Sequence, residues 1–436
     1  MTEEKLALQE KVKEKVALLK KMGGFRILEG IVDGKKGIRD MNPKDEPRRV
    51  AFLTDDDKEK KRASLKSELN LLKPLIEMGS REEAIESARE KSSKAGQILN
   101  ENLQTAIEAN KELETSYRSM DLFFRNAEEE GMRNLYFVNM STKEFINPDS
   151  TFRADIADHF DDKFDRFSLE NNYSLFVLPG YLGDELDYFS KMAKKYRITL
   201  VSDYKDSKDF EDIENGVEEQ KVGGDDTFKS NTILTCNYGA VRKKYDGLEK
   251  EDLFIPLSVA LAGKMYSSNG IQPPSGKRHG KLDGVLGTRL DLRKTQVDKI
   301  DKMGMIPVIY EGAWGTVAMS DVTLCVESTD PDLRALGVVR SMDWIAKVLL
   351  DYFNSLTFQV FDGNLRKEIN RELNNFFYKI KGHGKLIEEY KITKVEKDPE
   401  NPQAVKIGIN VKPFFAVKHY IIDFSGTQGN FEEDEG

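Results

Sequence analysis

Ser-Leu-Phe-Val-Leu, at residues 174–178, is a short run of mostly apolar residues, and Arg-Ile-Thr-Leu-Val at 197–201 is another. A helical segment lies between them. A strand that is covered on both faces of a sheet shows a continuous apolar run of this kind. Strands that alternate with helices indicate a mostly parallel sheet. We therefore predict an α/β fold for the centre of the chain.

The same alternation continues on both sides of these two runs. Asp330 supplies an N-cap and Pro331 a first-turn proline for a long helix. Asn364 opens a second helix, which Gly382 closes. Each helix has an apolar stripe at helical spacing, which predicts a buried face. Further strands are expected at 135–138, 232–236, 306–310 and 316–326.

The C-terminal segment is rich in strand-forming residues. Apolar residues alternate with polar or small ones over 405–411, which predicts a strand with one covered face. The run 414–424 is apolar on both faces, and an edge strand of that kind must be covered or paired. We expect a hairpin over 403–424.

The N-terminal part has a different pattern. Residues 3–22 form an amphipathic helix in this interpretation. Residues 23–49 cannot bury a core of their own, and the apolar run at 25–32 lies isolated among them as an extended arm. Residues 56–112 have helical spacing with few breakers. Residues 203–226 carry ten acids and three bases, 3 − 10 = −7, and we expect an exposed acidic insertion or loop there.

These patterns predict an α/β protein with two α/β portions, a helical N-terminal region and a β-rich C-terminal segment. The expected parts are 1–54 (helix and arm), 55–130 (helical), 131–330 (α/β, with the insertion 203–226), 331–425 (two helices, hairpin and terminal strand) and 426–436 (acidic tail).

Composition narrows the class of protein. The chain of 436 residues has 67 Lys and Arg against 76 Asp and Glu, a formal net charge of −9, which disfavours a nucleic-acid binder. No run of about 18 apolar residues occurs, so we expect no membrane insertion. The N-terminus has no signal-peptide core, and two cysteines are too few for a disulfide scaffold. We expect a cytoplasmic protein in which Cys236 and Cys325 are small buried hydrophobes.

No motif of a catalytic, cofactor or metal site is found. The closest match to a phosphate loop, 270–278, has five residues between its glycines, where four are needed, and Arg278 in place of Ser or Thr. We expect an ordered surface loop there, whose bases could meet an acidic patch on a partner subunit. The acids around His159 favour a solvated charged face over a cation site. The four histidines, His159, His279, His383 and His419, have no metal-binding spacing.

Several segments, taken in order, resemble one family. Leu-Glu-Thr-Ser-Tyr-Arg-Ser-Met at 113–120 is similar to the Leu-Glu-x-x-Trp-Arg-Gly-Leu element of the type VI secretion sheath large subunit, the TssC/VipB family. Residues 135–144, 173–181 and 302–308 resemble the strands that follow in that family. Tyr117 replaces the Trp and Ser119 the Gly, which is similar to the divergent branch of Bacteroidetes-type systems. The resemblance covers residues 113–425.

The resemblance implies a structural subunit of a contractile sheath with no catalytic, cofactor-binding or metal-binding residues. Its implied partners are the small sheath subunit TssB/VipA, further copies of itself, the inner tube protein Hcp, baseplate proteins and the ClpV disassembly ATPase. We expect strands exchanged between chains and a helix that ClpV grasps. The residues assigned to interfaces are Leu6, Val12, Val16, Leu19, Phe25, Ile27, Leu28, Ile31, Phe414, Phe415, Tyr420 and Ile422.

Two alternatives stay open at this point. One is the sheath of a phage-tail-like contractile particle. The other is a cytosolic α/β enzyme whose site is assembled from residues far apart in sequence. An enzyme would form a small closed oligomer, whereas a sheath subunit would form long tubes.

Overall fold

The computed structural model describes residues 67–70, 73, 77, 80–127, 135–140, 142–169, 172–268, 270, 272–416 and 418. The chain divides into two compact units, one of residues 1–117 and 243–253 and the other of residues 118–242 and 254–436. In the first unit the main described element is the larger part of α5 (Arg81–Asn126), a helix of 46 residues.

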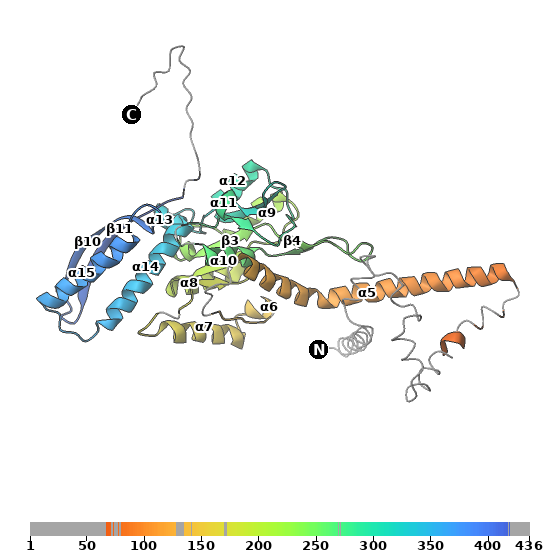
Figure 1. Cartoon of the computed structure of the whole chain (residues 1–436), viewed down its shortest axis with the longest axis horizontal. Helices are drawn as coiled ribbons and strands as arrows, with labels where there is room; N and C mark the ends of the chain where they lie inside the picture. The colour runs from red at the N-terminus through yellow and green to blue at the C-terminus, as the bar shows by residue number, and fades with distance from the viewer. Residues whose placement is uncertain are drawn as a thin grey trace, which may run out of the picture. The chain divides into compact units, whose positions relative to one another are not determined.

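The second unit is built on a six-stranded sheet with the order β1-β2-β3-β8-β9-β6 (Figure 1). The first four strands are parallel, and β8, β9 and β6 continue the sheet in antiparallel fashion. The runs at 174–178, 197–201, 232–236 and 306–310 therefore contain strands, as predicted. The bounds are Leu175–Val177 (β1), Thr199–Asp203 (β2), Thr232–Cys236 (β3), Met305–Glu311 (β8), Gly315–Ala318 (β9) and Lys281–Leu282 (β6).

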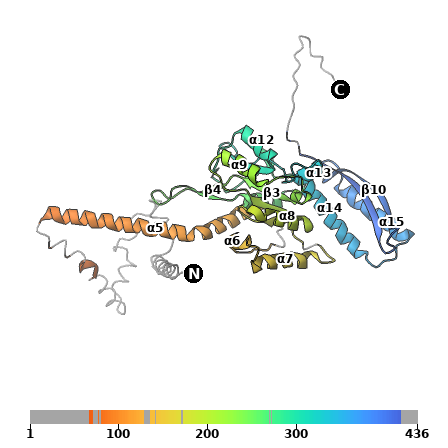
Figure 2. The same ribbon diagram turned by 180° about the vertical axis from the view of Figure 1, so that it is seen from behind.

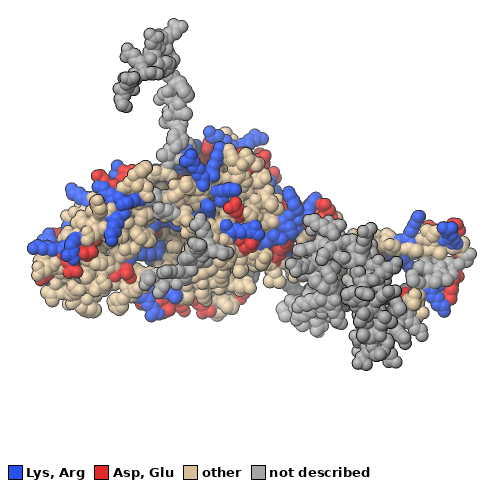
Figure 3. Space-filling model, viewed as in Figure 1, with Lys and Arg blue, Asp and Glu red and all other residues tan. Residues whose placement is uncertain are grey.

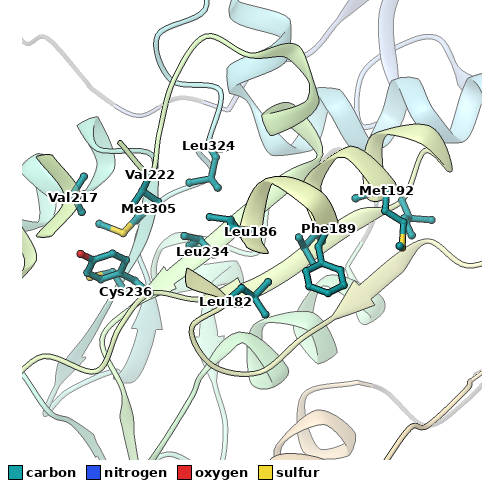
Figure 4. Close-up of a cluster of buried hydrophobic side chains, with 14 of the residues drawn as sticks. Leu182, Leu186, Phe189, Met192, Val217, Val222, Leu234, Cys236, Met305 and Leu324 are labelled. Carbon is teal, nitrogen blue, oxygen red and sulfur yellow. The ribbon is translucent and has the colours of Figure 1, made fainter. Parts of the chain in front are cut away.

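One face of this sheet is covered by α8 (Leu186–Lys195), α9 (Phe210–Gln220) and α12 (Lys294–Lys302). Leu234 and Met305 from the strands pack in one buried cluster with Phe189 of α8 and Val217 of α9 (Figure 4). Successive side chains of a strand point to opposite faces, so the alternate residues of the same strands face the other way.

The opposite face is covered by α10 (Ser258–Ser267). Ile233 and Ile306, which alternate with the clustered residues, are fully buried there. A Cβ atom on Gly263 would lie 2.4 Å from the carbonyl oxygen of Phe123, so glycine lets α10 pack directly against the end of α5. Other elements before residue 289 are α6 (Thr142–Phe145), α7 (Thr151–Phe164), α11 (Gly276–His279), η2 (Gly183–Glu185), η3 (Thr227–Asn231), and a three-stranded sheet of β5 (Leu253–Ile255), β4 (Gly239–Arg242) and β7 (Gly287–Thr288).

The C-terminal elements of the second unit have a core of their own. Helices α14 (Leu336–Ser355) and α15 (Gly363–Ile380) lie beside the hairpin of β10 (Ile387–Lys397) and β11 (Val405–Pro413) in both views (Figures 1 and 2). The short α13 (Pro331–Arg334) precedes them, and Asp330 caps it by accepting from the Asp332 amide. The long helix predicted to begin at Asp330 is thus interrupted at Ala335, whose backbone is extended, and α14 begins at Leu336. This separate core contains Ile345, Leu365, Ile369, Leu373, Phe377, Ile387 and Val395.

Three polar contacts join α14 to the rest of the second unit. Asp343 accepts from the Asn231 side chain at 2.5 Å, and Asp351 accepts from the Leu169 amide at 2.7 Å. Lys347 donates to the carbonyl oxygen of Tyr173 at 2.8 Å. Burial lowers the pKa of Lys347 from its usual 10.5 to about 8. One of these contacts is therefore made by a lysine whose positive charge is destabilised by burial in the folded state.

We expect the stability contributed by Lys347 to rise with pH. Above about pH 8 the folded state loses the Lys347 proton while the unfolded state keeps it, so unfolding takes up a proton and the folded state is favoured. Relative to Lys347→Met, the wild-type protein should gain about 1–2 kcal/mol between about pH 7 and pH 9.5. Urea unfolding at both pH values measures this difference. A difference that does not change with pH would show that Lys347 is not desolvated.

Four expectations need correction. Residues 203–226 are not a single exposed loop, because residues 210–220 form α9: Ile213 and Val217 bury one side of this helix, and the acids occupy its outer side. Residues 135–138 are exposed and form no strand. The strand expected at 316–326 ends at Ala318. The hairpin is formed by β10 and β11 rather than by 403–424, and residues 414–416 and 418 lie outside any strand.

Candidate interaction surfaces

Two of the titratable residues in the segment around His159 have side-chain partners. His159 bonds its Nε2 to the Tyr173 hydroxyl at 3.0 Å and stacks on Tyr136 with ring centroids 4.4 Å apart. Asp161 accepts from Lys195 at 2.7 Å and from Tyr196, and these bonds hold its pKa below the ordinary value. Within the described ranges, no three His, Cys, Asp or Glu side chains are grouped so that they could hold a metal ion.

Both cysteines are buried, as predicted. Cys236 is 1% exposed and Cys325 is 0% exposed. Burial raises the pKa of the Cys236 thiol to about 12 and also raises that of Cys325. Neither thiol is therefore activated as a nucleophile.

A buried carboxylate, Asp203, joins three elements at the end of β2. It is 0% exposed. It accepts from the amides of Leu257 and Ser258 at the start of α10, both at 2.8 Å, and from the Gly180 amide at 2.9 Å. The Thr235 hydroxyl donates to it as well. Burial raises the pKa of Asp203, although the donors act in the opposite sense. Because its hydrogen-bond donors all come from the protein itself, Asp203 stabilises the fold.

The long helix α5 carries an exposed apolar stripe. Leu113 is 65% exposed, Tyr117 69% and Met120 44%. Their spacing of four and three residues places them on one side of the helix. An apolar stripe on a helix usually faces a partner surface, so this stripe is a candidate docking site.

The C-terminal hairpin presents a second candidate surface. Within the described part of the chain, β10 and β11 pair with each other and form a two-stranded sheet, with one isolated bridge from Lys381 to Ile387. Side chains of α15 cover one face, where Phe377 stacks on Tyr390 at 5.0 Å. The outer edges of both strands can accept a further strand from another chain, because their amides and carbonyls point outward.

The residues that the sequence assigned to interfaces are placed only in part. Phe414 is half-buried and Phe415 is 47% exposed, directly after β11. Leu6, Val12, Val16, Leu19, Phe25, Ile27, Leu28, Ile31, Tyr420 and Ile422 lie outside the described residues.

The α5 stripe was not assigned to an interface from the sequence. Its signal was present, because Leu113, Tyr117 and Met120 lie in the element 113–120 that carries the family resemblance. The four-plus-three spacing could equally have belonged to a buried helix face, so burial was the missing information. No described helix is both long enough and apolar enough to cross a membrane.

Comparison with protein families matches nearly the whole chain in three consecutive parts. Residues 12–103 match the TssC/VipB-like N-terminal region, residues 105–325 the central domain of type VI secretion system TssC/VipB, and residues 335–435 the TssC/VipB-like C-terminal domain.

Individual relatives are more distant. The tail sheath protein of Vibrio phage KVP40 is 24% identical over 220 residues, which are 48% of this chain and 32% of the phage protein. The chain thus matches about a third of that relative's length. A chain in the contracted baseplate of the anti-feeding prophage is similar in fold, with a TM-score of 0.50, 10% identity and coverage of 72% of this chain and 84% of the other. A chain of the contracted helical sheath of the same particle gives a TM-score of 0.49, 15% identity and coverage of 71% and 82%.

Proposed function

Because the chain belongs to the TssC/VipB family of type VI secretion proteins, we propose that it is the large subunit of a contractile sheath. It polymerises with the small sheath subunit TssB/VipA around an inner tube of Hcp and contracts to propel that tube. The observation that carries the proposal is the match of three family regions, in order, from residue 12 to residue 435. The matched regions are those of a type VI protein, which favours this function over a phage-like particle.

The proposed role is structural and cytoplasmic. Contraction of such a lattice is a rigid-body rotation of subunits between two packings, and the energy resides in the interfaces between them. The exposed stripe of α5 and the open edges of the C-terminal hairpin support a protein that works through its contacts. Baseplate proteins would anchor the lattice, and ClpV would take it apart after contraction.

We propose the α5 stripe as the docking site of the small subunit. The stripe is apolar and helical, and such surfaces bind a partner helix or groove with anchors at this spacing. The small subunit is the partner that must be present in every repeat of the lattice, so it would cover the stripe throughout the tube. Leu113 and Tyr117 would be its central anchors, since they are the most exposed of the three.

Co-expression with the small subunit tests both proposals. The wild-type pair should give long tubes in negative-stain electron microscopy. Leu113→Asp with Tyr117→Asp should weaken the pair by about a hundred-fold, because two buried carboxylates would replace two apolar anchors. The control is Gln104→Asp with Lys111→Asp, two exposed positions on the opposite side of α5.

Size-exclusion chromatography of the pair measures this loss, and circular dichroism checks that α5 is retained. The control variant should elute with the small subunit and form tubes. If the stripe variant still co-elutes and forms tubes, the stripe is not the docking site. If the wild-type pair forms only small closed oligomers, the sheath function itself is wrong.

A further inference from the structure

A basic patch lies at the β6 edge of the large sheet. Lys277, Arg278 and His279 form most of the short helix α11, and Lys281 begins β6; all four are exposed. The Lys277 ammonium group lies 3.2 Å above the centre of the Trp314 ring. We call these four residues with Trp314 the basic patch. Figure 3 shows Lys and Arg side chains gathered over the end of the second unit that carries α11 and α12.

The patch is built into the sheet. The Ala318 amide of β9 donates to the Gly280 carbonyl oxygen at 2.8 Å. A Cβ atom on Gly280 would lie 2.5 Å from the Ala318 carbonyl oxygen, so glycine is needed for α11 to sit against β9. The cation–π contact with Trp314 orients Lys277 without neutralising it. The basic side chains are thus attached to backbone that the sheet holds in place. Among the described residues, only Lys281 of the patch has an acidic neighbour, Asp283 at 3.5 Å.

The same unit also has an acidic surface, on and around α9. Residues 203–226 carry ten acids and three bases, and of these acids Asp203 is buried. Helix α9 presents its acids to solvent because Ile213 and Val217 occupy its buried side. Three acids of the segment have basic partners: Glu214 pairs with Lys299, Asp206 with Arg289, and Asp226 lies 4.0 Å from Lys229. The exposed acids of this surface are Asp206, Asp209, Glu211, Asp212, Glu218, Glu219, Asp225 and Asp226.

We propose that the basic patch of one copy of this chain docks on the acidic α9 surface of a second copy. The inference rests on the proposed sheath function, and charge complementarity carries it: each copy offers one surface of each sign, both exposed. Joining two different patches is a head-to-tail contact, which leaves one free patch at each end and so continues into a ring or a helical filament. Such a contact would link successive copies of this chain within the lattice that it forms with the small subunit.

Charge reversal followed by charge exchange tests this contact in the full chain co-expressed with the small subunit. K277E/R278E should lower the yield of sedimentable tubes at least about ten-fold at about 0.15 M salt, because like charges then face each other. E218K/E219K should give the same loss. Combining all four substitutions restores opposite charges across the contact, and the yield should return to within about two-fold of wild type.

The matched control is R366E/K367E. It makes the same change in net charge at two exposed, adjacent bases of α15, which belong to neither the basic patch nor the acidic α9 surface. This control should form tubes with wild-type yield.

The outcomes separate this inference from the sheath function. If wild-type tubes form and K277E/R278E also assembles normally, or if the fourfold variant is not restored, the contact between copies is wrong and the sheath function stands. Loss of co-elution of K277E/R278E with the small subunit would assign the patch to that subunit and overturn the inference. Absence of wild-type tubes would count against the sheath function instead.

Discussion

Replacing Asp203 with alanine should lower the free energy of unfolding by about 4 kcal/mol or more. The side chain is fully buried and accepts from three backbone amides and one hydroxyl. Alanine would leave the amides of Gly180, Leu257 and Ser258 without an acceptor. A buried donor without a partner costs about 1–3 kcal/mol, and the three losses arise together at one point. They would loosen α10 from the end of β2.

Urea unfolding of the full chain, followed by circular dichroism, measures this effect. The matched control is Asp209→Ala, an exposed carboxylate before α9 that makes no capping bond, and it should cost less than about 0.5 kcal/mol. Asp203→Asn keeps one acceptor oxygen, so its loss of unfolding free energy should lie between the losses for Asp203→Ala and Asp209→Ala. A loss of under about 1 kcal/mol for Asp203→Ala would mean that water replaces the carboxylate.

The central sheet could be predicted because its strands are buried on both faces. Residues 232–236 are buried from end to end, and the run contains no charged residue, since its two polar side chains are those of Thr232 and Thr235. The helix start at Asp330 was also readable, since an N-cap aspartate followed by proline is a local signal. These features depend on the residues themselves and their immediate neighbours.

Other elements depend on contacts that a single sequence does not display. Helix α9 was missed because two apolar residues, Ile213 and Val217, suffice to pack it, and the acids around them dominate the composition. Strand β10 was missed because its register shifts between Ile392 and Lys394, which breaks the alternation of apolar and polar residues. Residues 135–138 have a strand-like composition, yet they are exposed in this chain.

The candidate surfaces also have some features that the sequence shows and others that appear only in the fold. The bases at 277–281 were recognisable as a possible match for an acidic surface, because charge is visible in the sequence. The cation–π contact with Trp314 joins residues that are 37 positions apart, and only the fold brings them together. The stripe of α5 differs from a buried stripe in exposure alone.

Removal of residues 1–54 should abolish tube formation while leaving a soluble complex with the small subunit. The sequence places an isolated apolar run at 25–32 and a second at 49–53 in this segment. An extended segment is unstable alone, since its amides need partners, and an edge strand of a neighbouring subunit can supply them. The open edges of β10 and β11 are the acceptors that we propose. The truncated chain keeps α5 and the sheets, so its pairing with the small subunit should persist.

A shorter deletion separates the arm from the helix that precedes it. Removing residues 1–22 deletes the stripe of Leu6, Val12, Val16 and Leu19 but keeps both apolar runs. This variant should form tubes of normal length and fail to be disassembled by ClpV, because the proposed ATPase ligand is lost. Size-exclusion chromatography and electron microscopy of both truncated pairs provide the comparison.

The two deletions together locate the link between subunits. Tubes of normal length from the chain without residues 1–54 would rule out donated strands from this segment. Loss of tubes already in the shorter deletion would assign the link to the helix and not to the arm. If the shorter deletion assembles and the longer one does not, the link lies within residues 23–54. A strand exchanged there would keep neighbours connected while their packed surfaces slide, because its hydrogen bonds to β10 or β11 move with the acceptor subunit.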